Sequence, residues 1–466
     1  MSLFSNLKSF SSNVVAIENS ENYTYDNLLK YTDIIRKNFK SRDTIFLISE
    51  NSFEFLCCYV ALIRNKSVIY LIEKSTNDQK LKFLIKSYKP KYILSLKKIN
   101  YPSKIKNVLN LNKRYMLFKT NYKINYKINK DLAILLSTSG STGSPKFVKL
   151  SYLNIFDNAK KISNYLKIQS GHKVITTMQP SYSYGLSIIN SHLLKGASII
   201  MTEKTLFEKT FWEIMKQHKV TTFGGVPFIF EILIKIKFEK IYLPHLKYVT
   251  QAGGNLSHKL LREMISIFKK KNMRLIVMYG QTEASPRMSY LPWRFLSKKI
   301  GSIGKPINGG KFYIFDKKKK IIKKSNSIGE LVYKGKNVML GYARNFRDLY
   351  KIRNNNLLFT GDLAYKDKEG FYYLTGRKSR FIKIFGLRYS LDEIEKEINK
   401  QGNNCAILGT DDYLNIFISN NYNKDRLLNL LFTNFKIRKS IVKLTNVSKI
   451  QRNKNGKILY SELKRK

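Results

Sequence analysis

The chain has few of the residues that form disulfide frameworks and metal centres. Its 466 residues include three cysteines, Cys57, Cys58 and Cys405. Two of these are adjacent and the third is distant, so neither their number nor their spacing fits a disulfide framework or a zinc site. We therefore expect reduced thiols and a cytoplasmic protein.

Long apolar runs are also absent. The most hydrophobic short run, Phe55 to Ile63, is half as long as the roughly 18 residues that a membrane-spanning helix needs. The first residues, Met1 to Lys8, lack the basic start and the apolar core of a signal peptide. The sequence therefore predicts neither a membrane span nor a signal peptide.

Acidic residues are scarce relative to basic ones. The chain has 85 Lys and Arg against 32 Asp and Glu, a formal net charge of +53. Such a charge is typical of proteins that bind nucleic acid or membrane surfaces. The lysines are spread from end to end, however, and the one compact run, Lys317 to Lys320, lies between apolar stretches and predicts a hairpin turn. We therefore favour a lysine-rich surface that attracts nucleotides, coenzyme A or an acidic carrier protein.

The residues that are abundant predict a folded chain of at least two domains. The sequence is 43% hydrophobic and 13% aromatic, and helical and strand patterns alternate through the first 300 residues. The expected helices are 23–39, 51–63, one that begins after Ser151, 206–218, 228–236 and 257–271. The expected strands are 43–48, 67–72, 147–150, 174–177, 220–223, 246–250 and 274–278. This alternation favours α/β layers with largely parallel sheets.

From about residue 300 the pattern changes to short strands and turns, with strands expected at 312–315, 330–333 and 371–374. An α+β segment follows. Ser390 and Glu393 predict a capping box for a helix that ends before Gly402. Further strands are expected at 404–408, 415–418 and 441–444, with a helix at 424–435. The residues between Gly376 and Ser379 form the expected domain boundary.

One polar stretch, Ser137 to Lys146, follows directly after the apolar run Leu132 to Leu136. Its sequence is Ser-Thr-Ser-Gly-Ser-Thr-Gly-Ser-Pro-Lys. Hydroxyls, open backbone amides and one cation can bind phosphate oxygens, and Gly140 and Gly143 permit close backbone approach. A flexible surface loop is the alternative. The stretch is not a Walker A motif, because Pro145 and Phe147 occupy its glycine and hydroxyl positions.

Five further stretches offer groups that a nucleotide needs. They are Tyr279-Gly-Gln-Thr-Glu283, Ala252-Gly-Gly254, Phe359-Thr-Gly-Asp362, Gly376-Arg377 and Asn453-Lys-Asn-Gly-Lys457. The first two follow expected strands, and the carboxyl ends of strands are where α/β sheets bind ligands. Glu283 can hold Mg²⁺, Asp362 can accept ribose hydroxyls, and Arg377 can bind ribose or phosphate. Taken singly, each stretch is also compatible with an ordinary turn.

In this order and at this spacing, the motifs resemble the adenylate-forming superfamily, which contains acyl- and aryl-CoA synthetases, luciferases and the adenylation domains of peptide synthetases. The resemblance extends from residue 24 to Lys457 and includes Gly329-Glu-Leu331 and Ile382-Lys-Ile-Phe-Gly386. It implies an α/β fold with a large N-terminal domain (1–376) of two α/β sheet subdomains and a distorted β-barrel. A hinge (377–379) and a small mobile α+β lid domain (380–466) would follow.

The resemblance also implies a reaction. A carboxylate attacks the α-phosphorus of ATP, which gives acyl-AMP and pyrophosphate, and a thiol then takes the acyl group. Two anions must meet, and their repulsion at 4 Å is about 1 kcal/mol in water but about 4 kcal/mol at an effective dielectric of 20. The implied catalytic residues are the cation Lys457, Thr282 beside the α-phosphate and the Mg²⁺ ligand Glu283.

The resemblance assigns the remaining site residues by position. The nucleotide-binding residues are Ser137, Thr138, Ser139, Gly140, Ser141, Thr142, Gly143, Lys146, Gly253, Gly254, Tyr279, Gly280, Gln281, Asp362 and Arg377. The acid pocket contains Tyr182, Tyr184 and Gly185. Gly386 lines the thiol tunnel, and Ser379 is the hinge residue.

Two positions depart from the family pattern. Ser379 stands where the hinge usually has Asp or Lys, so the usual charge of the hinge is missing. Tyr182 stands where amino-acid-activating members have an Asp and many acyl-activating members have a His. A buried ammonium group without a carboxylate is costly. We therefore expect a carboxylic acid without an α-amino group as the substrate.

The sequence thus predicts an acid–thiol ligase that uses ATP and Mg²⁺. The acceptor is coenzyme A or the phosphopantetheine of an acyl carrier protein, and the basic surface slightly favours an acidic carrier. A standalone amino-acid adenylation enzyme is the alternative within the superfamily, and a nucleic-acid-binding protein is the alternative from another class. A non-catalytic relative is a third alternative, against which the presence of Lys457 and Glu283 argues.

Overall fold

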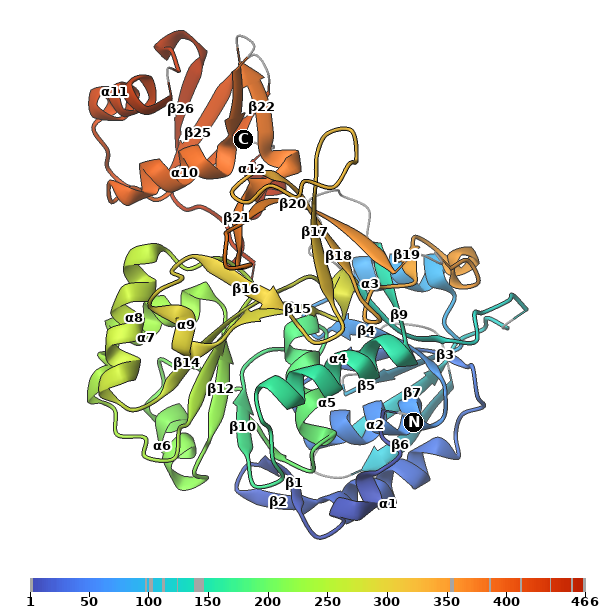
Figure 1. Cartoon of the computed structure of the whole chain (residues 1–466). Helices are drawn as coiled ribbons and strands as arrows, with labels where there is room; N and C mark the ends of the chain where they lie inside the picture. Colours follow the sequence, from blue (N-terminus) through green and yellow to red (C-terminus); the bar gives the residue numbers. More distant parts are fainter. Residues whose placement is uncertain are drawn as a thin grey trace.

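The computed structural model of the chain describes residues 3–96, 99, 104–110, 114–123, 125–137, 146–352, 356–384, 387–410, 413–435, 437–453 and 456–463. Two large sheets with their helices form the lower part of the molecule in Figure 1, and a small α+β unit lies above them. This arrangement confirms the predicted α/β fold class with a large N-terminal part and a small C-terminal α+β part.

The larger sheet has thirteen strands in the order β17-β18-β20-β21-β16-β15-β14-β13-β12-β10-β11-β1-β2. The strands from β14 to β1 in this order are parallel: β1 (Val14–Glu18), β10 (Lys173–Thr176), β11 (Ser198–Met201), β12 (Thr222–Gly225), β13 (Tyr248–Gln251) and β14 (Arg274–Gly280). The others are antiparallel: β2 (Glu21–Thr24), β15 (Arg287–Leu291), β16 (Ser302–Pro306), β17 (Lys311–Phe315), β18 (Gly329–Lys334), β20 (Leu357–Lys366) and β21 (Tyr372–Arg377). Strands β16, β17, β18, β20 and β21 thus continue the larger sheet, and no separate closed barrel is recorded among the described residues.

The smaller sheet has eight strands in the order β19-β9-β8-β4-β3-β5-β7-β6. Its parallel centre consists of β3 (Thr44–Ser49), β4 (Val68–Glu73), β5 (Tyr92–Ser95) and β8 (Leu132–Ser137). The antiparallel strands are β6 (Lys104–Asn110), β7 (Arg114–Lys119), β9 (Phe147–Ser151) and β19 (Gly341–Ala343). Strand β19 brings a segment from the second half of the chain beside β9.

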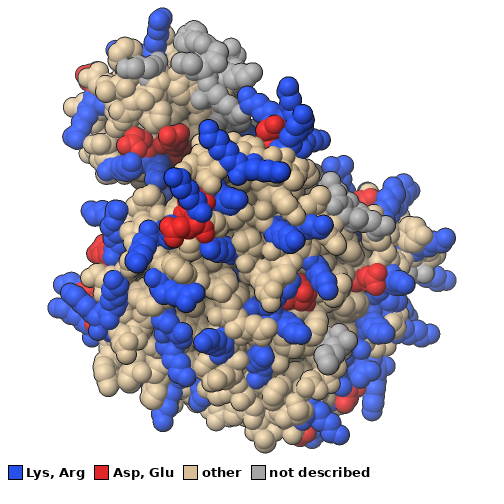
Figure 2. Space-filling model, in the orientation of Figure 1, with Lys and Arg blue, Asp and Glu red and all other residues tan. Residues whose placement is uncertain are grey.

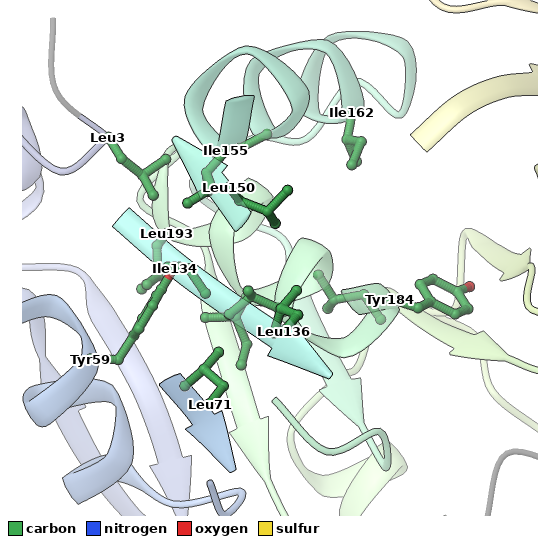
Figure 3. Packing of buried hydrophobic residues seen from close by; sticks show 14 of the residues in the cluster. Leu3, Tyr59, Leu71, Ile134, Leu136, Leu150, Ile155, Ile162, Tyr184 and Leu193 are labelled. Atoms are coloured by element: carbon green, nitrogen blue, oxygen red, sulfur yellow. The ribbon is translucent and has the colours of Figure 1, made fainter. Parts of the chain in front are cut away.

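The largest hydrophobic cluster lies between the two sheets, and three helices run through it (Figure 3). α2 (Phe53–Arg64) contacts β3 and β4, α4 (Tyr152–Tyr165) contacts β8 and β9, and α5 (Ser183–Leu193) contacts β10 and β11. The outer faces are covered by α3 (Asp78–Tyr88), α6 (Lys209–Gln217), α7 (Pro227–Lys235) and α8 (His258–Lys270). Helix α1 (Tyr25–Arg36) and the short α9 (Trp293–Leu296) complete this part.

The C-terminal unit has its own hydrophobic clusters, made of residues from Ile382 to Leu463. Its elements are β22 (Phe381–Ile384), β23 (Leu387–Ser390), α10 (Leu391–Lys400), β24 (Cys405–Gly409), β25 (Leu414–Ile418), α11 (Lys424–Phe435), β26 (Val442–Asn446) and α12 (Tyr460–Leu463). The clusters that contain the residues of the two large sheets include no residue after Leu374.

Most expected elements are present within two residues of the predicted ends, and α11 has the predicted bounds. Helix α6 begins at Lys209 rather than at residue 206, because the backbone N–H of Thr205 donates to the Glu208 carboxylate and the Leu206 carbonyl accepts from the Trp212 indole. Helices α3 and α5 and the short α9 and α12 were not predicted. All residues of α5 are buried, so its sequence lacks the charged, solvent-facing side that marks an amphipathic surface helix.

The features predicted from the scarce residues can be located in the structure. All three cysteines are buried free thiols. None of the helices in the described part of the chain combines the length and the apolar character needed to cross a bilayer. Lysines and arginines are scattered over the visible face in Figure 2 rather than gathered in one patch. The Lys317–Lys320 run forms the predicted turn, with the Asp316 N–H donating to the Lys320 carbonyl.

The substitution Ser151→Ala tests the N-terminal cap of α4, a helix that the sequence predicts to begin after Ser151. The Ser151 hydroxyl accepts from the Asn154 N–H at 3.0 Å, and the Asn154 side chain accepts from the Ser151 N–H at 2.8 Å. Loss of such a cap costs about 0.5–2 kcal/mol, so the urea midpoint of unfolding should fall. Ser170→Ala, at an exposed turn, is the control and should leave the midpoint unchanged. Equal effects of the two substitutions would contradict the prediction.

Candidate active site

Two neighbouring parallel strands end at the same edge of the larger sheet, and each is followed by a predicted site segment. β13 leads to Gly253 and Gly254, and β14 leads to a 3-10 turn, η3 (Thr282–Ala284). A side chain at Gly280 would place its Cβ 2.1 Å from the Pro286 carbonyl oxygen. Glycine is therefore required where the chain turns back to form β15, and this turn presents Thr282 and Glu283.

Asp362 is the most enclosed carboxylate of this region, with 5% of its surface exposed. It lies on β20 opposite Arg377 on β21, whose Nε is 3.4 Å from the carboxylate. The Tyr279 hydroxyl and the Gln281 amide both donate to the same carboxylate oxygen. Burial raises the pKa of Asp362, while Arg377, Tyr279 and Gln281 act against this increase. The structure thus brings together four of the residues that the resemblance assigns to nucleotide binding.

Glu283 is linked to Lys146 through Tyr342. The Tyr342 hydroxyl donates to Glu283 Oε1 at 2.8 Å, and Lys146 Nζ lies 4.0 Å from the centre of the Tyr342 ring. On the other side, the hydroxyls of Thr282 and Ser183 are 3.1 Å apart. A carboxylate and a hydroxyl on adjacent residues are hard oxygen donors of the kind that Mg²⁺ prefers.

Lys457 comes from the C-terminal unit and lies against this group. Burial lowers the pKa of Lys457, Arg377 lowers it further, and the carboxylates of Asp362 and Glu283 raise it. The turn before it also contacts the large domain, because a Cβ at Gly456 would be 3.2 Å from Cβ of Phe228 in α7. The cation therefore faces both carboxylates across the junction between the two parts of the molecule.

A buried network anchors the segment that follows Lys457. The Tyr460 hydroxyl of α12 donates to the Glu395 carboxylate, and Arg380 pairs with Glu395 at 2.8 Å. The Arg380 guanidinium also lies 4.0 Å from the Tyr460 ring and pairs with Asp392, which accepts from the Arg377 N–H. The hinge region and the end of the chain are thus tied to the same helix, α10, where Ser390 Oγ accepts from the Glu393 N–H.

Several predicted residues cannot be placed. Thr138, Ser139, Gly140, Ser141, Thr142 and Gly143 lie outside the described residues, as does Gly386. Ser137 ends β8, and Lys146 directly precedes β9, so the described ends of the polar stretch lie on adjacent strands. Ser379 lies in a 3-10 turn, η5 (Lys378–Arg380), between β21 and β22.

The three predicted pocket residues lie at the start of α5. Gly185 is required there, because a Cβ would be 2.5 Å from the Gln179 carbonyl oxygen. The Tyr182 hydroxyl would be 2.6 Å from a Cβ at Gly253. The Tyr184 hydroxyl is 2.7 Å from Thr250 Oγ1, and Tyr184 lines a small cavity.

The sequence interpretation missed several residues of this site. Ser183, Tyr342 and Arg287 contact or adjoin predicted residues, but none belongs to a motif that was singled out. Arg287 gives the clearest signal, as one charged residue at the start of the apolar run Arg-Met-Ser-Tyr-Leu, four residues after Glu283. The other two become recognisable only when distant segments are brought together.

Comparisons with known proteins identify the class to which this geometry belongs. The family model described as AMP-binding enzyme matches residues 6–343, more than half of the chain. The chain therefore belongs to the AMP-binding enzyme family, and it is an acid–thiol ligase of the AMP-forming, acyl-CoA synthetase type.

Individual relatives are distant. The oxalate–CoA ligase of Arabidopsis thaliana is 26% identical over 379 residues, which cover 76% of this chain and 73% of that protein. The 2-succinylbenzoate–CoA ligase of Oceanobacillus iheyensis is 30% identical over 265 residues, covering 57% of this chain and 53% of that protein. Among solved structures, O-succinylbenzoate coenzyme A synthetase of Bacillus subtilis in complex with AMP has a TM-score of 0.82 at 18% identity and covers 100% of this chain and 98% of its own. The last likeness shows the fold.

Substituting Gly253→Ala tests the close approach of Tyr182 to the β13 edge. Gly253 has φ +87°, and an added Cβ would meet the Tyr182 hydroxyl. The left-handed backbone alone costs a residue with a side chain about 1–2 kcal/mol. We expect lower stability to urea, with partial recovery in Gly253→Ala/Tyr182→Phe. Gly171→Ala, where no atom lies within 4 Å of the new Cβ, is the control. A loss no larger than that of the control would refute the contact.

Proposed function

We propose that the chain activates a carboxylic acid with ATP as acyl-AMP, releases pyrophosphate, and transfers the acyl group to coenzyme A. The observation that carries the proposal is that Lys457 is buried where the charges of Arg377, Asp362 and Glu283 all act on its pKa. These groups come from the two parts of the molecule and form one site with alternating charges. Relatives named as CoA ligases support coenzyme A as the acceptor.

The first half-reaction needs a cation between two anions. A carboxylate must approach the negatively charged α-phosphate, and Lys457 lies where it can offset this repulsion. Thr282 donates its hydroxyl to the α-phosphate, and Lys146 with the polar stretch holds the departing pyrophosphate. Glu283, with Thr282 beside it, would hold Mg²⁺, and the ion would supply neutralisation of phosphate charge there.

The nucleoside end has its own contacts. Asp362 accepts the ribose hydroxyls, and its pairing with Arg377 and hydrogen bonds from Tyr279 and Gln281 fix the direction of the carboxylate. We assign the adenine ring to the backbone of Gly253 and Gly254, which follow the end of β13. Most of the catalytic advantage then comes from positioning and from fixed charges.

The proposed boundaries are 1–376, 377–379 and 380–466. These boundaries are supported by the hydrophobic clusters. The clusters of the large part contain only residues before η5, and those of the C-terminal unit contain only residues after it. Rotation of the lid about Ser379 would withdraw Lys457 and bring Gly386 to the thiol for the second half-reaction. A cytoplasmic location is also a proposal.

The acid substrate lacks an α-amino group in this proposal. Among the residues that the structure describes, no acidic one lines the cavity beside Tyr184, and Arg287 lines it instead. An α-ammonium group would therefore meet a cation rather than a carboxylate. An acidic carrier protein is a second candidate acceptor, for which the net charge of +53 is the specific observation.

Substituting Lys457→Ala should separate the two half-reactions. We expect ATP-dependent formation of acyl-AMP to fall by about 100-fold or more, because the cation that offsets the anionic repulsion is lost. Thioester formation from supplied acyl-AMP should be retained. Lys449→Ala, at an exposed position of the same unit, is the control. The measurements are the rates of pyrophosphate exchange and of thioester formation. Equal losses in both rates would show that the role assigned to Lys457 in the first half-reaction is wrong.

In a plot of the rate of acyl-AMP formation against pH, the decrease on the alkaline side (the alkaline limb) should reflect deprotonation of Lys457. Burial holds its pKa below the usual lysine range, and the cation is lost as pH rises through this lowered pKa. The rate should therefore fall at a lower pH than a solvent-exposed lysine would cause. In Lys457→Arg the guanidinium stays charged, so the limb should move to higher pH even if the rate is lower. An identical limb in both enzymes would exclude Lys457 as its origin.

A further inference from the structure

Arg287 is a buried cation that the reaction described above does not use. It begins β15, and 2% of its surface is exposed. Its backbone is fixed on both sides, because its N–H donates to Asn158 Oδ1 and its carbonyl accepts from the side-chain amides of Asn158 and Asn337. The direction in which its side chain leaves the strand is therefore set.

The guanidinium lacks a charged partner within the described ranges. No ion pair joins Arg287 to a described carboxylate, and its Nε is buried without a hydrogen-bond partner. Its neighbours are phenols: the Tyr184 ring centre is 5.1 Å from Cζ, and Arg287 acts against the burial that raises the pKa of Tyr165 to about 12. Neutral phenols do not compensate a buried charge, which costs several kcal/mol when it is unpaired.

A second polar group without a partner lies on the same cavity. Arg287, Tyr248 and His192 all line it. The Tyr248 hydroxyl has the Thr222 side chain as a polar neighbour, whereas His192 Nε2 is buried without a partner in the described structure. Burial lowers the pKa of His192 to about 4, and its Nδ1 lies 2.8 Å from the Ile188 carbonyl. The neutral ring therefore donates through Nδ1 and presents Nε2 as an acceptor. A cation without a described carboxylate partner and an imidazole acceptor without a donor, both on one cavity, indicate a polar ligand.

The cavity adjoins the place where the acid reacts. Tyr184 lines it, and the preceding residue, Ser183, has its hydroxyl 3.1 Å from that of Thr282. From Tyr184 to Ser191, which also lines the cavity, α5 rises about 10 Å. The lining is otherwise apolar or hydroxylic, with Ile188, Phe223 and Met278 among its residues. A short acid that reacts beside Thr282 would thus extend into the cavity towards Arg287.

We propose that Arg287 binds a second carboxylate of the acid, so that the substrate is a short dicarboxylic acid. The inference rests on the proposed function, because it takes the cavity as the acid pocket. A carboxylate is the group that pairs with a planar guanidinium through two parallel hydrogen bonds. The Tyr248 hydroxyl is available as a further donor, and His192 Nε2 can accept from a hydroxyl on the acid or from a bridging water.

The test is ATP–pyrophosphate exchange with acids matched in carbon number, namely butanoate against butanedioate and hexanoate against hexanedioate, with amino acids as a separate arm. Wild-type protein should favour one or both dicarboxylic acids by at least tenfold in kcat/KM. Arg287→Met should remove or reverse this preference. Arg294→Met is the matched control, since Arg294 lies 4.8 Å from the Phe295 ring but is exposed and does not line the cavity.

Two further variants keep the test decisive if Arg287→Met does not fold, as judged by thermal unfolding. Arg287→Lys should retain part of the preference, because the charge remains but the planar pairing is lost. Tyr248→Phe should raise KM for the dicarboxylic acid without changing KM for its monocarboxylic match.

The outcomes separate this inference from the function on which it rests. Exchange that is equal for matched acids, or an equal loss for both acids in Arg287→Met, would overturn the inference and leave the proposed function intact. Exchange with amino acids alone would overturn both the inference and the expectation of a substrate without an α-amine. Wild-type protein that exchanges with no acid in any arm would refute the proposed function and the inference with it.

Discussion

The site depends above all on the burial of one charge, the Asp362 carboxylate. A carboxylate with 5% of its surface exposed needs donors, and it receives them from Tyr279, Gln281 and Arg377. These donors come from the end of β14 and from the last residue of β21, which directly precedes the C-terminal unit. Satisfying one buried charge therefore aligns the sheet edge with the antiparallel strands.

The same principle explains the contrast between Asp362 and Arg287. Both are charged groups in a low-dielectric interior, but Asp362 is satisfied by protein donors while Arg287 lacks a charged partner among the described residues. A satisfied charge holds the structure together, whereas an unpaired one on a cavity wall favours binding of a group of opposite charge. The protein thus uses buried charge in two ways, to position the nucleotide end of the site and, in our proposal, to select the acid.

Local sequence determined much of the fold. The spacing of apolar residues predicted most helices and strands, because an element buried on one face has apolar residues at regular intervals, as in α4 with its Ser151 cap. This spacing did not predict α5, because a helix buried on all sides has no such regular interval. Motif order was equally informative for the site, because Tyr279, Asp362 and Arg377 do lie together. Their catalytic roles and those of the polar stretch remain proposals.

The sequence by itself determined the α/β class, the order of the nucleotide motifs and the family, because these follow from residue types and spacings along the chain. Only the tertiary structure decided which residues meet across the chain. Tyr342 reaches Glu283 from 59 residues away, and Lys457 reaches Asp362 and Glu283 from the other domain. Burial was likewise decided in three dimensions. The sequence shows Arg287 only as one of 85 basic residues that happens to begin an apolar run, whereas its burial without a charged partner among the described residues follows from what packs around it.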